Sequence, residues 1–324
     1  MDVFWYALVG LLLAGYLALE SIDFGVGMLL PLAPSEAGRA RVRRTIVPLF
    51  LANEVWLVAF VGLLFGALPL LEGKLLYALR LPLLALLTAW FLRDAALWFR
   101  GAHPGAAWRR TWDVVLPVSS LVLAAGWGAV LAALVRGLST NGGGHAVLTA
   151  ADLLHPFALL GGCVTVAGSL RQGSLFAGRA VPGDSVHAVR LGRVRRAVTP
   201  ALLVLLLTGV VGALTTGAPP AVAGVGALAA VCVLASEASL RSGRTFSALL
   251  FGAVPFLTAP LAVGAAHGTT VLATRSGAGE LDLSEAIADA ASLQLLAVTV
   301  LPVFLVVIPA QVWIWRVFAP SDRA

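Results

Sequence analysis

The fold is decided by the stretch Glu20-Ser21-Ile22-Asp23-Phe24-Gly25-Val26-Gly27, together with Asn53-Glu54-Val55-Trp56 in the next apolar segment. Residues 3–31 are apolar apart from a few positions, and about 20 such residues are enough to cross a bilayer as a helix. Glu20 and Asp23 are three residues apart, so they lie on one face of that helix. Because a carboxylate inside a membrane is costly unless it faces protein or water, the two acids predict a functional site. A buried polar clamp that only holds helices together is the alternative interpretation.

The composition is that of a helical protein with many membrane spans. The chain has 324 residues, of which 60% are hydrophobic and 12% charged, and its mean hydropathy is +0.95. A soluble domain carries about 25% charged residues. The net charge of +6 does not indicate nucleic-acid binding, because most basic residues form short clusters between apolar segments. Cys163 and Cys232 lie inside apolar segments without a CxxC motif, which argues against a disulfide framework, a thiolate metal site and covalently attached haem.

The apolar segments predict an all-α polytopic membrane protein, a single integral-membrane domain over residues 1–324. The nine expected spans are 3–31, 47–68, 77–98, 114–136, 151–170, 198–216, 221–238, 246–266 and 289–317. They are interpreted as two four-helix groups plus one helix. Residues 1–170 hold the first helix group, spans one to five, with its polar residues; a basic connection covers 171–197, and spans six to nine occupy 198–324. Val181-Pro182-Gly183-Asp184 predicts a turn within the connection.

The basic residues predict the orientation of the chain. The connections after the first, third, fifth and seventh spans hold fifteen arginines, whereas the other connections and their helix edges hold four basic residues. Because basic connections stay on the cytoplasmic side, the N-terminus is expected outside and the C-terminus in the cytoplasm. Four glycines are expected to allow close helix packing: Gly161, Gly162, Gly209 and Gly212.

Depth along the helices brings five polar residues towards one layer in the cytoplasmic half of the membrane. Counted from the cytoplasmic helix ends at about 1.5 Å per residue, this layer holds Glu20, Asp23, Asn53, Glu54 and Arg93. Three acids share one arginine, so at least one carboxyl is expected to be neutral or linked to water. Such a group could relay protons, or it could be a hydrogen-bond donor that only packs.

The chain has few residues suited to independent catalysis. Its five histidines are not spaced to ligate one haem from one helix: His103, His145, His155, His187 and His267. Dinucleotide-binding, phosphate-binding and nucleophile-elbow motifs are absent from the sequence. We therefore expect no catalytic residue and no metal ligand in this chain.

Several motifs resemble subunit II of the cytochrome bd quinol oxidase. The most specific are Leu19-Glu20-Ser21-Ile22-Asp23-Phe24-Gly25-Val26-Gly27-Met28 and Asn53-Glu54-Val55-Trp56-Leu57. Weaker matches follow: Arg80-Leu81-Pro82-Leu83-Leu84 with Arg93, Phe99-Arg100-Gly101, His155-Pro156-Phe157-Ala158-Leu159-Leu160-Gly161-Gly162 with Thr165, and Asp289-Ala290-Ala291-Ser292. The resemblance spans nearly the whole chain and agrees with nine spans.

The resemblance implies a pseudo-symmetric heterodimer in the bacterial cytoplasmic membrane. The partner, subunit I, would carry haems b and d and the quinol site, and the complex would oxidise quinol, reduce O2 to water and take protons from the cytoplasm. This chain would bind no haem; it would stabilise the complex and contribute a proton route or hold a structural quinone or lipid, and a small accessory subunit is left open. Trp56, Arg100 and Asp289 would be helix-packing or interface positions.

The departures from the family pattern mark a divergent member. Ser21-Ile22 stands where the family usually has Gly-Phe, and Phe50-Leu51-Ala52 where it has Trp-Asp-Gly. Leu51 therefore replaces the acid proposed to carry protons through this subunit. Trp98 replaces a usual glutamate, and Arg171-Gln172-Gly173 stands where a histidine is common.

The sequence thus predicts a non-haem subunit of a bd-type terminal oxidase. Two alternatives stay open. One is a secondary transporter in which Glu20, Asp23 and Arg93 bind a substrate or couple protons, with Gly25 and Gly27 breaking the first helix. The other is a subunit retained only for assembly, which the missing acid at Leu51 favours.

Overall fold

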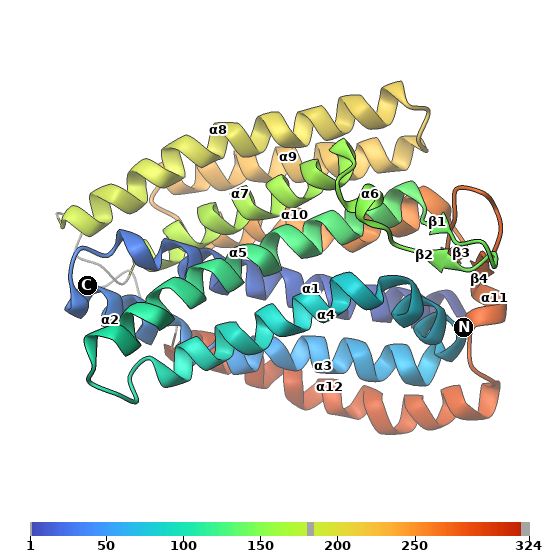
Figure 1. Cartoon of the computed structure of the whole chain (residues 1–324), viewed down its shortest axis with the longest axis horizontal. Helices are drawn as coiled ribbons and strands as arrows, with labels where there is room; N and C mark the ends of the chain where they lie inside the picture. Colours follow the sequence, from blue (N-terminus) through green and yellow to red (C-terminus); the bar gives the residue numbers. More distant parts are fainter. Residues whose placement is uncertain (1, 180–184, 319–324) are drawn as a thin grey trace.

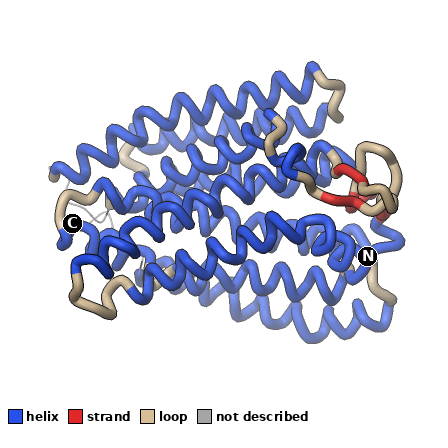
Figure 2. Tube along the Cα trace, in the orientation of Figure 1, coloured by secondary structure: helices blue, strands red, loops and turns tan. Residues whose placement is uncertain are grey.

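The computed structural model describes residues 2–179 and 185–318, which form a bundle of long helices (Figure 1). The long helices are α1 (Asp2–Leu29), α3 (Phe50–Ala67), α4 (Pro69–Phe99), α5 (Ala106–Arg136), α7 (Pro156–Gly178), α8 (Val186–Thr215), α9 (Pro220–Arg241), α10 (Thr245–His267) and α12 (Ala290–Phe318). The short helices are a 3-10 turn (Leu30–Leu32), α2 (Glu36–Ile46), α6 (Ala150–Leu153) and α11 (Leu283–Ala286). Two antiparallel ribbons, β1 (Ser139–Thr140) with β2 (Ala146–Val147) and β3 (Thr270–Leu272) with β4 (Leu281–Asp282), lie at one end of the bundle (Figure 2).

Local sequence signals set the helix ends. Proline occupies the first turn of α4, α7 and α9, where its missing N–H leaves no hydrogen bond unmade. Ser185 caps α8, because its side chain accepts a hydrogen bond from the Ala188 amide at 3.1 Å. Gly137 follows α5 with a φ of 81°, a backbone conformation that disfavours any side chain.

Eight of the described helices are long and apolar enough to cross a membrane, so the chain is a multi-pass membrane protein. They are α1, α3, α4, α5, α8, α9, α10 and α12. The remaining expected span, the fifth at 151–170, corresponds to α7, which has 23 residues but is not among the eight. Many small and polar residues, including Arg171 and Gln172, make α7 less apolar, and its neighbours α1, α5, α8 and α10 surround it.

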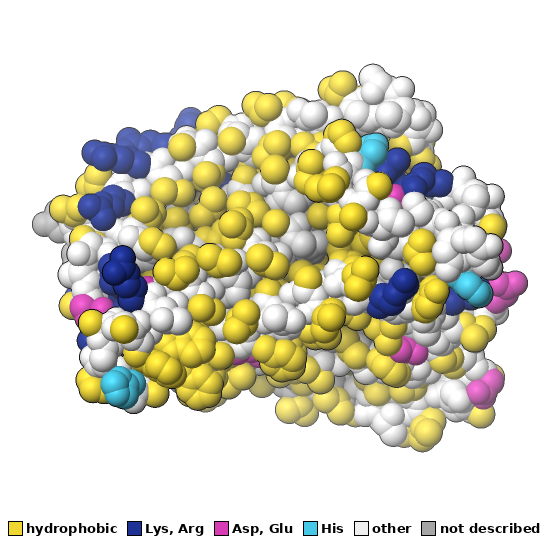
Figure 3. Space-filling model, viewed as in Figure 1, with side chains coloured by type: hydrophobic (Ala, Val, Ile, Leu, Met, Phe, Trp, Pro, Cys, Tyr) yellow, Lys and Arg dark blue, Asp and Glu magenta, His cyan; other side chains and the backbone are white. Residues whose placement is uncertain are grey.

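Helix α1 is the centre of the bundle and positions the site. It packs against α3, α5, α7 and α10 (Figure 1). The helices α7, α8, α9 and α10 pack in sequence along one side, whereas α12 packs chiefly against α3. Large apolar side chains cover the flank of the bundle, and basic side chains are visible at both of its ends (Figure 3). The end that carries α2 holds the arginines of that helix: Arg39, Arg41, Arg43 and Arg44. We call these two ends of the bundle the α2 end and the strand end.

The predicted spans were too short at several ends. Helix α4 starts at Pro69, α5 at Ala106 and α8 at Val186, each eight or more residues before the expected start, and α7 continues to Gly178. Hydropathy marks only the apolar part of a helix, whereas backbone hydrogen bonding continues past it through polar residues. The expected basic connection is therefore largely helical, and its predicted turn at 181–184 lies outside the described residues.

The glycine prediction was right for two of the four positions. A methyl group on Gly161 would overlap the Gly128 carbonyl of α5, and one on Gly162 would lie 3.0 Å from the Ala125 carbonyl. Gly212 has nothing within 4 Å of such a group, and Gly209 meets only the end of a leucine side chain, at 3.7 Å. These two positions therefore do not serve close backbone packing.

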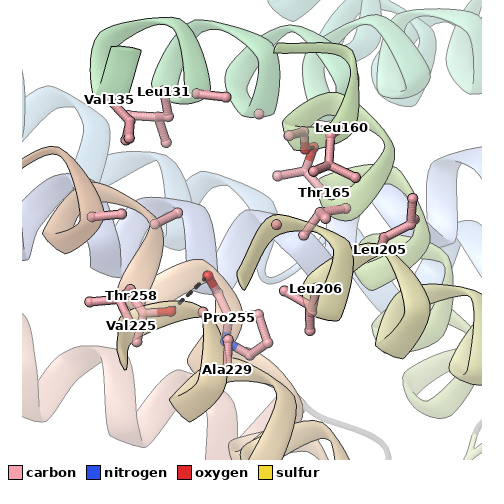
Figure 4. Close-up of a pocket in the computed structure, with 18 of the residues that line it drawn as sticks. Leu131, Val135, Leu160, Thr165, Leu205, Leu206, Val225, Ala229, Pro255 and Thr258 are labelled. Atoms are coloured by element: carbon pink, nitrogen blue, oxygen red, sulfur yellow. Dashed lines mark hydrogen bonds between the residues drawn. The ribbon is translucent and has the colours of Figure 1, made fainter. Parts of the chain in front are cut away.

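Gly209 lines a small apolar cavity of about 150 Å³ between α5, α7, α8, α9 and α10. Figure 4 shows its walls, which include Leu131, Leu160 and Leu206. The hydroxyl of Thr258 donates to the Pro255 carbonyl at 3.2 Å, so it is already hydrogen-bonded. A methyl group at Gly209 would meet only the end of the Leu160 side chain, at 3.7 Å, so the cavity has room for it.

Gly209→Ala is expected to stabilise the protein by about 1 kcal/mol, because alanine favours the helical backbone and adds contacts in the cavity. The matched variant Gly128→Ala should destabilise it, since its methyl group would overlap Thr165 and the Gly161 carbonyl. Thermal unfolding of the purified protein in one detergent measures both. Equal melting temperatures for the two variants would contradict the packing described here.

Candidate functional site

A buried arginine on α4 joins acids from two other helices. Arg93 is 1% exposed; its Nη1 donates to Glu20 Oε2 on α1 and its Nη2 to Glu54 Oε1 on α3. Its Nε donates to Asp94 Oδ1 at 3.0 Å, and the guanidinium lies 5.6 Å from the centre of the Phe24 ring. One guanidinium therefore links three helices through charged hydrogen bonds, which are stronger than neutral ones.

Asp23 does not pair with Arg93 in the same way. Its Oδ2 accepts a hydrogen bond of 2.8 Å from Asn53 Nδ2, and the Gln311 amide of α12 lies 2.9 Å from Asn53 Oδ1. A chain of amides thus connects the acid of α1 to the last helix. Sequence reasoning missed Gln311, although a glutamine deep inside the apolar run of α12 was a usable signal.

The polar cluster, meaning Glu20, Asp23, Asn53, Glu54 and Arg93, is brought together by the fold. All five side chains are buried, and Glu20 Oε1 and Asp23 Oδ1 have no hydrogen-bond partner among the described residues. The cluster therefore holds three carboxyl groups and one guanidinium group, and two of its carboxyl oxygens can still accept a hydrogen bond. Chemically it can accept a proton or a water molecule.

The other three residues singled out from the sequence lie away from the cluster. The ring of Trp56 packs on α1, where a methyl group at Gly15 would overlap it. Arg100 lies at the α2 end and pairs with Glu36 at 2.7 Å and with Asp113. Asp289 lies at the strand end, where it caps α12. The Ser292 hydroxyl donates to its Oδ2 at 2.7 Å and the Ser292 amide to its Oδ1 at 3.1 Å, and these hydrogen bonds lower the pKa of its carboxyl.

A second buried ion pair was missed, because Arg171 was placed in the cytoplasmic connection. Arg171 is 1% exposed inside α7 and lies 3.5 Å from the Glu237 carboxylate of α9. Its Nε donates to Thr199 Oγ1 of α8 at 3.2 Å. The expectation failed because α7 runs two turns beyond the apolar stretch and still faces protein there.

An apolar cavity of about 570 Å³ adjoins the polar cluster between α1, α3, α4 and α5. Trp90 lines it and donates from Nε1 to Glu54 Oε1 at 2.8 Å, so it separates the cavity from the buried charges. Tyr16 and Trp127 form another part of the wall, with ring centres 5.7 Å apart. The cavity is long and apolar enough for a hydrocarbon chain.

The described residues contain no group of three or more His, Cys, Asp or Glu side chains placed to hold a metal ion. No histidine lines the cavity of about 570 Å³. His155 caps α7 by accepting from the Phe157 amide at 3.2 Å, and His267 lies 2.9 Å from the Leu134 carbonyl. These two histidines are therefore already engaged in hydrogen bonds within the chain.

The sequence profile of the family described as cytochrome bd terminal oxidase subunit II matches residues 1–318. The chain belongs to this family. Its relatives include the cytochrome bd ubiquinol oxidase subunit 2 of Bacillus subtilis (strain 168), 26% identical over 97% of this chain and 94% of that protein. The cytochrome bd-I ubiquinol oxidase subunit 2 of Escherichia coli (strain K12) is 29% identical, over 53% of this chain and 47% of that protein.

The fold is also that of a solved relative. The bd oxidase structure from Geobacillus thermodenitrificans contains a chain that matches with a TM-score of 0.77 and 18% identity, over 98% of both chains. That match concerns the fold alone. It agrees with the helical, membrane-spanning architecture found here.

Two positions where this subunit II departs from the family pattern lie on the outside of the bundle. Leu51 is 53% exposed at the start of α3, and Trp98 is 54% exposed near the end of α4. They belong to one surface, because the rings of Phe50 and Trp98 have centres 6.0 Å apart. Exposed apolar side chains, Leu51 and Trp98, thus stand at the two positions where the resemblance implied acids. The polar cluster, by contrast, retains its acids.

Proposed function

We propose that this chain is the non-haem subunit of a bd-type terminal oxidase, an oxidoreductase that oxidises quinol and reduces O2 to water. The observation that carries the proposal is the end-to-end match to a subunit of a cytochrome bd ubiquinol oxidase. Catalysis would reside in subunit I with haems b and d. This chain would stabilise subunit I as a heterodimer, and its polar cluster would assist proton uptake.

The orientation is part of the proposal. The α2 end, which holds the arginines of α2, would face the cytoplasm of a bacterial cell. Helix α7 would cross the membrane in addition to the eight helices named above. The chain would then place its polar cluster in the cytoplasmic half of the membrane. That is the side from which the protons would come.

Co-expression with a subunit I tests the assignment. We expect a stable complex whose haem content and quinol-dependent oxygen uptake require this chain. Its subunit composition would also reveal any small accessory polypeptide. Failure to form a complex, or oxygen uptake independent of this chain, would refute the assignment.

The transporter interpretation is not favoured by the family match. The distinction that matters is between a proton role and a purely structural role for the polar cluster. Asp23 separates them, because among the described residues its carboxylate accepts a single side-chain hydrogen bond, from Asn53, and its Oδ1 has no partner. An amide can keep the packing but cannot take up a proton.

Asp23→Asn is therefore expected to assemble normally and to slow oxygen uptake severalfold. Asparagine has nearly the same shape, and its carbonyl can still accept the bond from Asn53. Oxygen uptake per haem in proteoliposomes measures the effect. Unchanged turnover in a normally assembled complex would leave the cluster with a structural role only.

A structural quinone is the ligand that we propose for the cavity beside Trp90. Its volume of about 570 Å³ and its apolar lining suit part of an isoprenoid chain. Solvent extraction and mass spectrometry of the purified complex, with and without added quinone, measure the occupant. A phospholipid recovered in place of quinone would contradict this assignment.

A further inference from the structure

A charged cavity of about 500 Å³ opens at the α2 end, between α2 and the start of α5. Its polar wall carries Glu36, Arg39, Arg109, Arg110 and Asp113. Its apolar wall is formed by the end of the first span and the flank of α5: Leu30, Pro31 and Val114. The cavity therefore presents charge on one side and hydrocarbon on the other.

The acids of this cavity are already neutralised. Arg100, only 3% exposed, donates to both oxygens of Glu36 at 2.7 and 2.8 Å and to Asp113 Oδ2 at 2.9 Å. These hydrogen bonds raise the pKa of the Arg100 guanidinium, and the bond from Arg100 lowers the pKa of Glu36. Arg39 adds a further bond to Asp113 at 3.2 Å. Both carboxylates are thus paired with arginines.

Positive charge remains after this pairing. Five arginines surround the two carboxylates, so positive charge exceeds negative charge by three. These arginines are Arg39, Arg43, Arg100, Arg109 and Arg110. Arg109 reaches Glu36 only at 3.8 Å. Arg43 Nε is buried and has no hydrogen-bond partner among the described residues. Burial, and next the charge of Arg100, lower the pKa of Arg43. The excess of positive charge around the cavity favours binding of an anion.

Exposed aromatic side chains beside the cavity indicate that it lies at the level of the lipid headgroups. Trp108 and Phe99 are 39% and 52% exposed, and Trp108 Nε1 donates to the Phe99 carbonyl at 2.7 Å. Trp112 completes this group, with its ring centre 5.6 Å from that of Trp108. Exposed aromatic residues next to basic ones are typical of the membrane interface. A phospholipid whose phosphate bound here would have its acyl chain beside Val114.

We propose that the cavity between α2 and α5 binds the phosphate group of an anionic phospholipid, held by Arg109 and Arg110 with its acyl chain along Leu30 and Val114. Basic pockets between spanning helices suit such headgroups, and arginine binds phosphate through paired hydrogen bonds. The proposal goes beyond the proposed oxidase function. It assigns a structural lipid to one defined place on this subunit.

The test uses the complex purified in mild detergent and reconstituted with phosphatidylglycerol or with phosphatidylcholine. Native mass spectrometry counts the lipids that the complex retains. We expect one phosphatidylglycerol to be retained, and Arg109→Gln/Arg110→Gln to weaken this retention roughly 30-fold. The matched control Arg193→Gln/Arg196→Gln, which removes the same charge from exposed positions on α8 at the same end, should retain the lipid.

Three outcomes would overturn the proposal. They are equal retention in the two double variants, retention of phosphatidylcholine to the same extent, or displacement of the lipid by excess inorganic phosphate. Ala106→Glu is a second variant that removes no ion pair and puts an acid in the first turn of α5, where it suits the helix. It should also lose the lipid, and a folded Ala106→Glu complex that keeps it would equally overturn the proposal.

Discussion

Arg93→Leu is expected to abolish accumulation of the folded protein. The substitution removes the one cation that neutralises Glu20 and Glu54, both buried among three helices. Leaving a buried charge without its partner costs about 3–5 kcal/mol, a large part of the total stability of most proteins. Size-exclusion chromatography of the extracted protein, with its melting temperature, measures the loss.

Two further variants make the Arg93 experiment specific. Arg80→Leu on the same helix is the matched control, because Arg80 is exposed and forms no ion pair among the described residues. It donates to the Tyr77 carbonyl at 2.9 Å and lies 4.7 Å from the centre of the Tyr77 ring. Combining Arg93→Leu with Glu20→Gln and Glu54→Gln should restore part of the yield, since the two carboxylates that Arg93 joins on other helices are then neutral. Asp94, the remaining partner of Arg93, is 21% exposed and keeps contact with solvent. If Arg93→Leu and Arg80→Leu behaved alike, the ion pairs would not hold the helices together.

Gly25→Ala is expected to have the second largest effect, through packing instead of charge. A methyl group at Gly25 would overlap the Ser169 carbonyl and lie 2.8 Å from the Gly173 Cα, so α1 and α7 would have to separate. Overpacking between two backbones costs about 1–3 kcal/mol, and here no flexible side chain can yield. Melting temperature and yield measure the effect.

Gly10→Ala is the matched control for Gly25→Ala, because it lies on the same helix and has nothing within 4 Å of the added methyl group. It should be neutral or stabilise the protein by about 0.5–1 kcal/mol through helix propensity. A Gly25→Ala protein as stable as Gly10→Ala would show that α1 and α7 do not pack as closely as described.

Sequence reasoning located the acids of the site but only part of their partners. Glu20 and Asp23 stand out because a charge within an apolar segment is costly wherever the helix lies. Trp90, by contrast, is one of nine tryptophans, and nothing in its local sequence shows that it bonds to Glu54. Arg171 was misplaced because the sequence does not show which polar helix ends face protein and which face water.

The sequence by itself determined that the chain is helical and crosses a membrane, because 60% hydrophobic residues in long uninterrupted runs can satisfy their backbone groups there only as helices. It also predicted that the acids and Arg93 lie in one layer of the bundle, since each residue advances a helix by a constant rise. Only the tertiary structure decided that Arg93 bonds to Glu20 and Glu54 while Asp23 takes Asn53. Those pairings depend on how each helix is rotated about its axis, which packing contacts set between residues far apart in the chain.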